Sequence, residues 1–152
     1  MRLLAIGKAA NNAPESELLA RYAARIKPAL ELVELPAGFG SPAEIKRREA
    51  DSLLAALKPD EFLIALDGGG TAPDSPELAK LLTKWTETGK KLAFAIGGAE
   101  GLDAAIIARA GAKLSLGKLT WPHMLVRPML AEQIYRAQMI NAGHPYHRAG
   151  RP

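Results

Sequence analysis

The sequence contains no cysteine, and its 152 residues include only three histidines. Without thiolates the chain can form no disulfide, no iron–sulfur cluster and no cysteine-ligated zinc site, and it has no cysteine nucleophile. Two of the histidines, His144 and His147, stand three positions apart in the last segment of the chain, flanking a proline and a tyrosine. We assign no metal site to this pair and expect a protein without a metal.

The sequence also lacks long apolar runs and the common nucleotide-binding motifs. No apolar run approaches the roughly 20 residues that span a bilayer, and the first residues become polar too soon for a secretory signal. We therefore expect a cytoplasmic protein. The glycines of IGGAEG (96–101) follow the fourth predicted strand, whereas a dinucleotide fingerprint follows the first, and there is no G-x-x-x-x-G-K-[ST] phosphate loop.

What is present is a regular alternation of short apolar runs and longer amphipathic segments, without repeats or linkers. The pattern predicts strands at 2–6, 30–36, 62–67, 91–98 and 112–117, and helices at 14–26, from 42 onward, at 75–88, 103–110 and 123–141. SPAE (41–44) has the signature of a capping box at a helix start. This order is typical of an α/β fold with a mostly parallel sheet covered by helices on both faces. We expect a single domain over 1–152.

Three predicted strand ends carry the residues of interest, because ligands in open parallel sheets bind beyond the carboxyl ends of the strands. These ends are Leu66-Asp67 before the glycines 68–70, Gly97-Gly98, and Leu116-Gly117 before KLTWPH. Glycine lets a backbone approach a ligand closely, although a pair of glycines after a strand is also common in a plain tight turn. We expect the glycines 68–70 to end their strand.

The predicted helix at 123–141 is apolar on two sides. One stripe contains Val126, Leu130, Ile134 and Ala137, and the other contains Leu125, Met129, Tyr135 and Met139. A helix that is apolar on most sides needs partners on most sides, which favours a subunit interface; a groove in the helix's own domain is the alternative. Pro128 predicts a kink if the helix already begins at Pro122.

The positive charge is concentrated late in the chain. Residues 104–152 contain seven Lys or Arg residues and a single acid, Glu132, which indicates either a polyanionic partner or a solvated surface. The last segment, NAGHPYHRAGRP, adds a hydroxyl, an imidazole and a planar guanidinium in Tyr146, His147 and Arg148. His123 and Arg127 share one helix face at i, i+4, and the alternative for both is a structural role.

Several motifs together resemble one family. In this order, DGGG and SPELA, FAIGGAEGL, LSLGKLTWPHMLVR, AEQIYRA and NAGHPYHR resemble the bacterial 23S ribosomal RNA pseudouridine N3-methyltransferases of type H, which belong to the SPOUT class. ELPAG and EIKRREA extend the resemblance into the first half of the chain. Two departures are Pro128, where the family continues with an apolar helix former, and AGRP after Arg148, where relatives stop.

The resemblance implies a homodimer with a C-terminal trefoil knot, which uses S-adenosylmethionine and no metal to methylate N3 of a pseudouridine in a 23S stem-loop, on the assembled 70S ribosome. Members of this type have no separate RNA-binding domain, so the dimer surface would recognise the RNA. The family's cofactor pocket corresponds here to Leu66, Gly97, Leu116, Gly117, Lys118, Leu119, Thr120 and Trp121.

Methylation of a pyrimidine N3 requires loss of its proton and no covalent cysteine adduct, which is consistent with the absence of cysteine. Our first candidates are His147 for proton transfer, Arg148 for charge or phosphate contact and Tyr146 for positioning the base. His123 and Arg127 are the second choice, and both could face the RNA from the other subunit. We expect the tail to fold over the cofactor as a lid.

Two other classes of protein stay open. A non-catalytic ribosome-binding or assembly protein would keep the knot and the basic surface, although it would need neither the glycine turns nor HPYHR. A small nucleotide-binding enzyme of flavodoxin-like shape would need phosphate-loop glycines after the first strand, where AIGKAANN has only one glycine.

Overall fold

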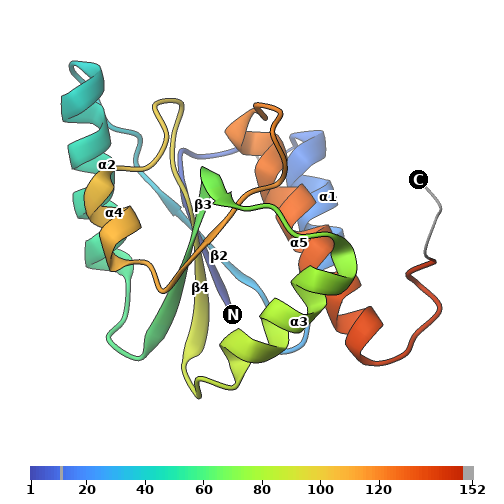
Figure 1. Ribbon diagram of the computed structural model, residues 1–152. Helices are drawn as coiled ribbons and strands as arrows, with labels where there is room; N and C mark the ends of the chain where they lie inside the picture. The colour runs from blue at the N-terminus through green and yellow to red at the C-terminus, as the bar shows by residue number, and fades with distance from the viewer. Residues whose placement is uncertain (11, 149–152) are drawn as a thin grey trace.

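The computed structural model describes residues 1–10 and 12–148. Five strands form one parallel sheet in the order β2-β1-β4-β3-β5. The strands are β1 (Arg2–Ile6), β2 (Glu31–Leu35), β3 (Glu61–Thr71), β4 (Lys91–Ile96) and β5 (Ala112–Leu114), and the helices are α1 (Pro14–Ala23), α2 (Pro42–Ala56), α3 (Ser75–Thr86), α4 (Ala104–Arg109) and α5 (His123–Asn141) (Figure 1). The predicted α/β class with a parallel sheet is confirmed.

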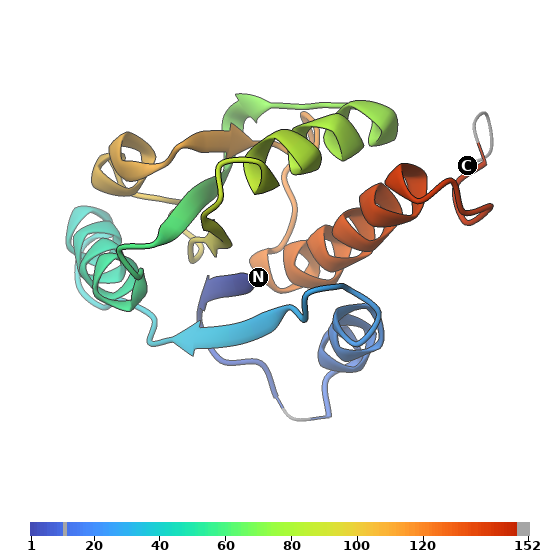
Figure 2. The same ribbon diagram turned by 90° about the horizontal axis from the view of Figure 1, so that it is seen from below.

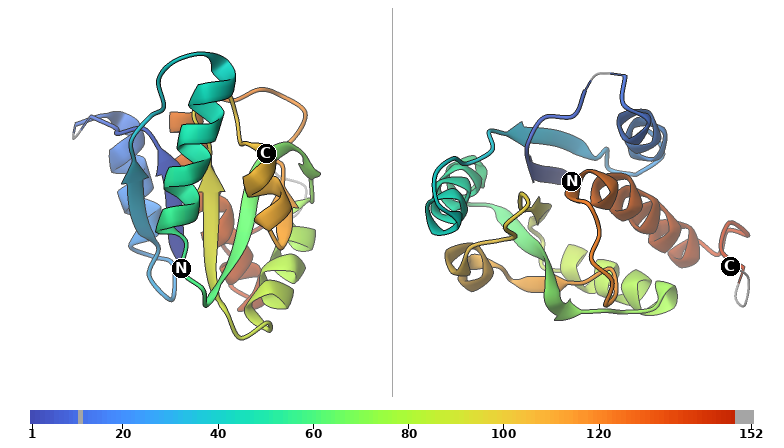
Figure 3. Two further views of the ribbon diagram at one scale, coloured as in Figure 1. Left: turned by 90° about the vertical axis from the view of Figure 1, so that its left-hand side faces the viewer. Right: turned by 90° about the horizontal axis from the view of Figure 1, so that it is seen from above.

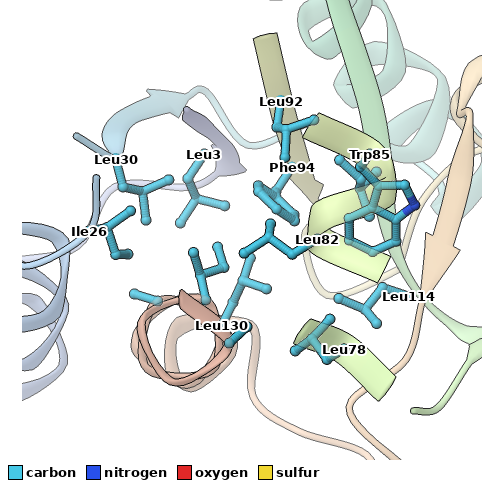
Figure 4. Packing of buried hydrophobic residues seen from close by; sticks show 14 of the residues in the cluster. Leu3, Ile26, Leu30, Leu78, Leu82, Trp85, Leu92, Phe94, Leu114 and Leu130 are labelled. Carbon is cyan, nitrogen blue, oxygen red and sulfur yellow. The ribbon is translucent and has the colours of Figure 1, made fainter. Parts of the chain in front are cut away.

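Helices cover both faces of the sheet, as predicted. Helices α1, α3 and α5 lie on one face, and α2 and α4 lie on the other (Figures 2 and 3). The first face buries the larger core, in which Phe94 of β4 packs against Trp85 of α3 and near Leu130 of α5 (Figure 4). A smaller cluster lies beneath α2 and α4 and includes Leu53 and Ile106.

The starts of α2 and α3 follow local rules. The capping box predicted at 41–44 is present, since the Ser41 side chain accepts from the Glu44 N–H and the Glu44 carboxylate accepts from the Ser41 N–H. Asp74 and Glu77 form a second capping box before α3. These caps satisfy backbone donors that a helix start otherwise leaves free, so both helix positions follow from sequence alone.

The glycines 68–70 do not end β3, contrary to our prediction. The strand continues to Thr71, and the pairing with β5 shifts register between Leu66 and Thr71. A Cβ on Gly70 would lie 2.8 Å from the Leu114 backbone nitrogen, so only glycine permits this approach. The Ser115 N–H also donates to the Thr71 carbonyl over 2.8 Å. The end of β3 is thereby joined to the chain that leaves β5.

Helix α5 lies between α1 and α3 (Figure 2). It runs without interruption from His123 to Asn141, with Pro128 inside it. Leu130, Ile134 and Ala137 of the first apolar stripe are buried, whereas Met129, Tyr135 and Met139 of the second are only partly covered and Leu125 is exposed. The chain's own groove therefore accounts for most of the first stripe and for Tyr135, which packs against the core, and leaves Leu125, Met129 and Met139 exposed or only partly covered.

In the part of the chain that the structure describes, no helix is both long and apolar enough to cross a bilayer.

Candidate active site

A cavity of about 320 Å³ opens at the carboxyl edge of the sheet, where the chain leaves β3, β4 and β5. All eight residues that the sequence singled out for a cofactor line it: Leu66, Gly97, Leu116, Gly117, Lys118, Leu119, Thr120 and Trp121. The loops after β4 and β5 both lie at the top of the view in Figure 1. The topology thus brings together three segments that are spread over residues 66–121, at the place where parallel sheets bind ligands.

Glycines shape the wall of this cavity in two ways. A Cβ on Gly97 would lie 2.8 Å from the Gly101 carbonyl carbon, so the turn after β4 closes tightly on itself. Gly68, Gly101 and Gly117 instead have nothing within 4 Å of a built Cβ, and Gly117 has φ +106°. Side chains at these three positions would extend into open space. Their absence leaves bare backbone for a ligand to approach.

The buried carboxylate of Glu49 binds the turn after β4, from the face of the sheet that α2 covers. Glu49 belongs to α2 and is 4% exposed. It accepts from the Gly98 N–H over 3.2 Å and from the Gly38 N–H over 3.1 Å. One side chain therefore connects the loop after β2 with the loop that lines the cavity, and it leaves no room for a Cβ on Gly98, which would lie 2.7 Å from Glu49 Oε1.

The cavity lining has the chemical character that S-adenosylmethionine requires. The apolar side chains of Leu66, Ile96, Leu116 and Val126 suit a flat heterocycle, and the bare glycine backbone offers N–H and C=O groups to polar substituents. Asp67, Lys118 and His123 are the ionisable groups along the wall. Leu119 at 72% and Trp121 at 39% exposure extend this wall to the surface. The residues present therefore fit the group that the sequence resemblance implied.

His123 and Arg127 have different surroundings, although they are one turn apart. His123 lines the cavity. Arg127 is 2% exposed; it pairs with Glu34 over 2.8 Å and donates to the carbonyls of Ile6 and Gly7, each over 2.8 Å. The guanidinium is thus enclosed within its own chain, and Arg127 is not among the residues that line the cavity. In this structure Arg127 fastens α5 to β1 and β2.

The tail packs back along α5 rather than over the cavity. The Tyr146 hydroxyl donates to the Glu132 carboxylate over 3.0 Å, and its ring meets Tyr135 edge-on with centroids 4.8 Å apart. Arg136 Nη1 lies 3.5 Å from His147 Nδ1. Among the described residues, none of the tail lines the cavity. The lid that we expected is therefore not formed here, because the tail has partners on α5.

Of the remaining tail residues, Arg148 is exposed. The extension AGRP, at 149–152, lies outside the described residues.

Ionisation in the tail is tied to this packing. Burial raises the pKa of the Tyr146 hydroxyl, and hydrogen bonding with Tyr22 and Glu132 raises it further. The hydrogen bond to Glu132 raises the pKa of Arg136. Glu132 accepts from Tyr146 and from Arg136 through the same oxygen, Oε1. One carboxylate oxygen therefore joins the Tyr146 hydroxyl of the docked tail to the Arg136 guanidinium of α5.

A second cavity, of about 450 Å³, adjoins the first and shares Leu114 to Gly117 with it. Glu132 and Pro128 of α5 line its other side. The residue that anchors the tail is therefore one cavity away from the candidate cofactor site. Pro128 helps to shape that space rather than to end the helix.

Sequence reasoning missed one acid at this site, Glu49. It gave no local signal, because it lies in the middle of a helix and acts on residues far away in the chain. Asp67, which the sequence placed at a strand end without a role, lines the cavity, and its carboxylate accepts from the Gly69 N–H over 2.9 Å. Within residues 1–10 and 12–148 there is no group of three or more side chains that could hold a metal ion.

Comparisons with known proteins agree on one family. A family model described as "Predicted SPOUT methyltransferase" matches residues 1–147. A protein of Acidiphilium cryptum named Ribosomal RNA large subunit methyltransferase H is 61% identical over 152 residues, which cover 100% of this chain and 96% of the relative. A protein of the same name from Gluconacetobacter diazotrophicus is 54% identical, with 100% and 99% covered.

One solved structure is similar in fold. It is described as that of a probable methylase family protein from Haemophilus influenzae, and the match has a TM-score of 0.57 at 11% sequence identity. The match covers 99% of this chain and 71% of the other.

Proposed function

This chain belongs to the SPOUT methyltransferase family, and from that membership we propose that it transfers a methyl group from S-adenosylmethionine to the ribosomal RNA of the large subunit. The single observation that carries the proposal is the cavity at the three strand ends, which collects every residue that the sequence resemblance assigned to the cofactor. The relatives' printed names supply the class of substrate.

More narrowly, the acceptor is N3 of a pseudouridine in a stem-loop of 23S rRNA, presented by the assembled 70S ribosome. The motifs that support this assignment are IGGAEG, LTWPHMLVR and HPYHR. A ribosomal substrate places the activity in the cytoplasm. The basic residues that lie between positions 104 and 152, apart from the buried Arg127, recognise the RNA.

The cofactor is held by the backbone at Gly97 and Gly117 and by the apolar wall that includes Leu66 and Leu116. When bound, S-adenosylmethionine supplies an electrophilic methyl group on a sulfonium. The protein's task is to hold the acceptor nitrogen in line with that methyl and to accept its proton. Lys118, Thr120 and Trp121 at the mouth orient the cofactor and shield it from water.

Two histidines are candidates for the base that accepts the proton from the acceptor nitrogen. His123 lines the cavity in the same chain, and this geometry makes it the first candidate. His147, with Tyr146 and Arg148, belongs to a tail docked on α5, so these three act once the tail leaves that position, on the base or on a phosphate. Arg127 keeps its structural role.

The working unit is a homodimer with a knotted C-terminal part. The outward stripe of α5, with Leu125, Met129 and Met139, offers the apolar face that a second copy would cover. A two-fold contact along this helix would also double the basic surface that faces the RNA. Sedimentation of the purified protein at several concentrations measures the oligomeric state.

The decisive experiment is incubation with methyl-labelled S-adenosylmethionine and, separately, 70S ribosomes, free 50S subunits and naked 23S RNA, all from cells that lack the modification. Nucleoside mass spectrometry then locates the label. Label as N3-methylpseudouridine with 70S ribosomes alone supports the enzyme and its substrate together. Ribosome binding without any label would instead support the docking or assembly protein.

A further inference from the structure

Phe39 lies in the loop between β2 and α2 and is 68% exposed. Single exposed apolar side chains are common on protein surfaces, so the surroundings of this ring decide whether it has a role. The loop and the cavity-lining turn after β4 lie at the same edge of the sheet (Figure 3).

Arg48 covers one face of this ring. Its guanidinium carbon lies 3.8 Å from the Phe39 ring centroid, directly over the ring, as in a cation–π stack. The ring nevertheless keeps most of its surface accessible, so its other face is turned to solvent. We call this pair the Phe39–Arg48 stack.

The backbone around Phe39 leaves little freedom. A Cβ on Gly38 would lie 2.7 Å from the Ile45 carbonyl oxygen, and Gly40 adopts φ +106°, which favours glycine. The next residue, Ser41, is locked in the capping box of α2. The loop is therefore pre-organised, and binding at Phe39 would cost little additional ordering.

Glu49 links this loop to the cavity. Its carboxylate accepts from the Gly38 N–H on one side and from the Gly98 N–H on the other. The Gly38 and Gly98 N–H groups share the Glu49 carboxylate, and Gly98 lines the cavity. Phe39 directly follows Gly38, so it is one residue away from this connection. The loop that carries the Phe39–Arg48 stack is therefore joined through Glu49 to the cavity lining.

Basic residues lie beside the stack, because Lys46, Arg47 and Arg48 are consecutive in α2. Of the acids in the same helix, Glu44 caps the helix start, Glu49 is buried and Asp51 is exposed. An aromatic face beside a basic cluster is the combination that binds single-stranded RNA, since bases stack on aromatic and guanidinium planes while lysine and arginine meet phosphates.

We propose that the Phe39–Arg48 stack binds an unpaired base of the RNA substrate next to the nucleotide that is methylated. The inference rests on the proposed function, because it names a contact to the same substrate. Phe39 acts here as a substrate-binding residue and takes no part in methyl transfer. It would hold the RNA at a set distance from the cavity through the bridge formed by Glu49.

The test compares Phe39→Leu, Phe39→Trp and Phe39→Ala with wild type. Leucine keeps an apolar side chain but cannot stack, whereas tryptophan can. Leu54→Ala is the matched control, because Leu54 is likewise an exposed apolar side chain, at 37%, but belongs to α2 and not to the Phe39 loop. The measurements are KM and kcat with the ribosomal particle that serves as substrate, binding to that particle in the presence of S-adenosylhomocysteine, and calorimetric binding of S-adenosylmethionine alone.

We expect Phe39→Leu and Phe39→Ala to raise KM and weaken particle binding by about 5- to 100-fold, the range measured for loss of one stacked base. Changes in kcat and in S-adenosylmethionine binding should be small. Phe39→Trp should bind as tightly as wild type, and Leu54→Ala should behave as wild type.

A wild-type KM in Phe39→Ala would overturn the proposed base stacking. Full activity in Phe39→Leu together with lost activity in Phe39→Ala would also overturn it, and would indicate an apolar contact with a protein instead. If wild type itself methylates no ribosomal particle, the proposed function fails. If wild type is active and the variants match it, only the stack fails.

Discussion

Arg127 of α5 and Glu34 of β2 form an ion pair in which Nη1 and Oε1 are 2.8 Å apart, across 93 positions of the chain. The arginine side chain is 2% exposed and the glutamate side chain 25%. Glu34 also accepts from the Ala9 N–H over 2.8 Å, so the pair draws together the loop after β1 and the first turns of α5. His123, one turn before Arg127, is thereby held at the cavity.

Replacing Arg127 by methionine should strongly destabilise the fold. The change leaves the Ile6 and Gly7 carbonyls and the Glu34 carboxylate without their guanidinium partner. Removing one member of a buried pair costs about 3–5 kcal/mol, and we expect the lower end because Glu34 retains some solvent contact. Urea unfolding at a fixed protomer concentration measures the loss.

The double variant Arg127→Met/Glu34→Gln should lose less stability than the two single variants added together. As a control, Arg136→Ala at the more exposed pair with Glu132 should cost about 1 kcal/mol or less. Equal losses at both pairs would show that burial does not set the strength of the Arg127 contact.

Gly97→Ala should distort the turn after β4 and weaken cofactor binding. Its Cβ would meet backbone atoms of Gly101, which cannot move aside as a side chain can. Overpacking of this kind costs roughly 1–3 kcal/mol. Gly68→Ala is the matched variant for stability, because nothing lies within 4 Å of its Cβ, and its free energy of unfolding should change by less than about 0.5 kcal/mol. Calorimetry with S-adenosylmethionine and urea unfolding measure both effects.

Glu49→Gln should weaken the link between the Phe39 loop and the cavity. The carboxylate accepts two N–H groups, whereas an amide has one acceptor oxygen and would turn its own NH₂ toward a donor. A buried donor left without a partner costs about 1–3 kcal/mol. Amide hydrogen exchange should accelerate at Gly38 or Gly98, and unchanged protection at both would contradict the bridge.

Tail docking should weaken in alkaline solution. Burial and the contacts with Tyr22 and Glu132 raise the pKa of Tyr146 above its ordinary value of about 10. An undocked tyrosine therefore ionises at lower pH than a docked one, so docking is fully stable below pH ~10 and loses stability as pH rises above it. The absorbance titration near 295 nm, wild type minus Tyr146→Phe, should show this late transition.

Glu132→Gln should move the Tyr146 transition toward pH 10, because it removes the negative charge beside the hydroxyl. An unchanged titration in this variant would leave burial and the contact with Tyr22 as the causes of the raised pKa.

Deletion of residues 144–152 should abolish methyl transfer while the dimer stays folded, because in the described part of the tail the contacts are to α5 rather than to the core. S-adenosylmethionine binding should persist, since the cavity lining lies elsewhere. Retained methylation would reject a role for Tyr146, His147 and Arg148. His123→Ala in the full chain then tests the other base: loss of kcat with cofactor affinity kept would support it.

Much of the architecture could be predicted because its signals are local. Apolar spacing located all ten elements, and the capping box at Ser41 and Glu44 lies within four residues. The parallel sheet and the convergence of three strand ends followed from the strand–helix alternation, since crossover connections place all carboxyl ends at one edge. The eight cavity residues then came from the family resemblance together with this edge.

Local signals failed where a distant segment decided the outcome. Glycines at 68–70 are typical of a turn, yet β3 continues because β5 packs against Gly70. Arg127 has the spacing of a surface residue beside His123, yet Glu34, 93 positions away, encloses it. No local pattern in the sequence indicated that Tyr146 of the tail contacts Glu132 and Tyr135 of α5.

Patterns along the chain were enough to identify the class of fold, the helix caps, the family and the edge of the sheet that carries the site. Three contacts could be known only from the folded chain: Glu49 bridges Gly38 and Gly98, Arg127 is internal, and Tyr146 donates to Glu132. Propensity and capping act within one or two turns, whereas a buried charge finds its partner only after folding has brought remote segments together.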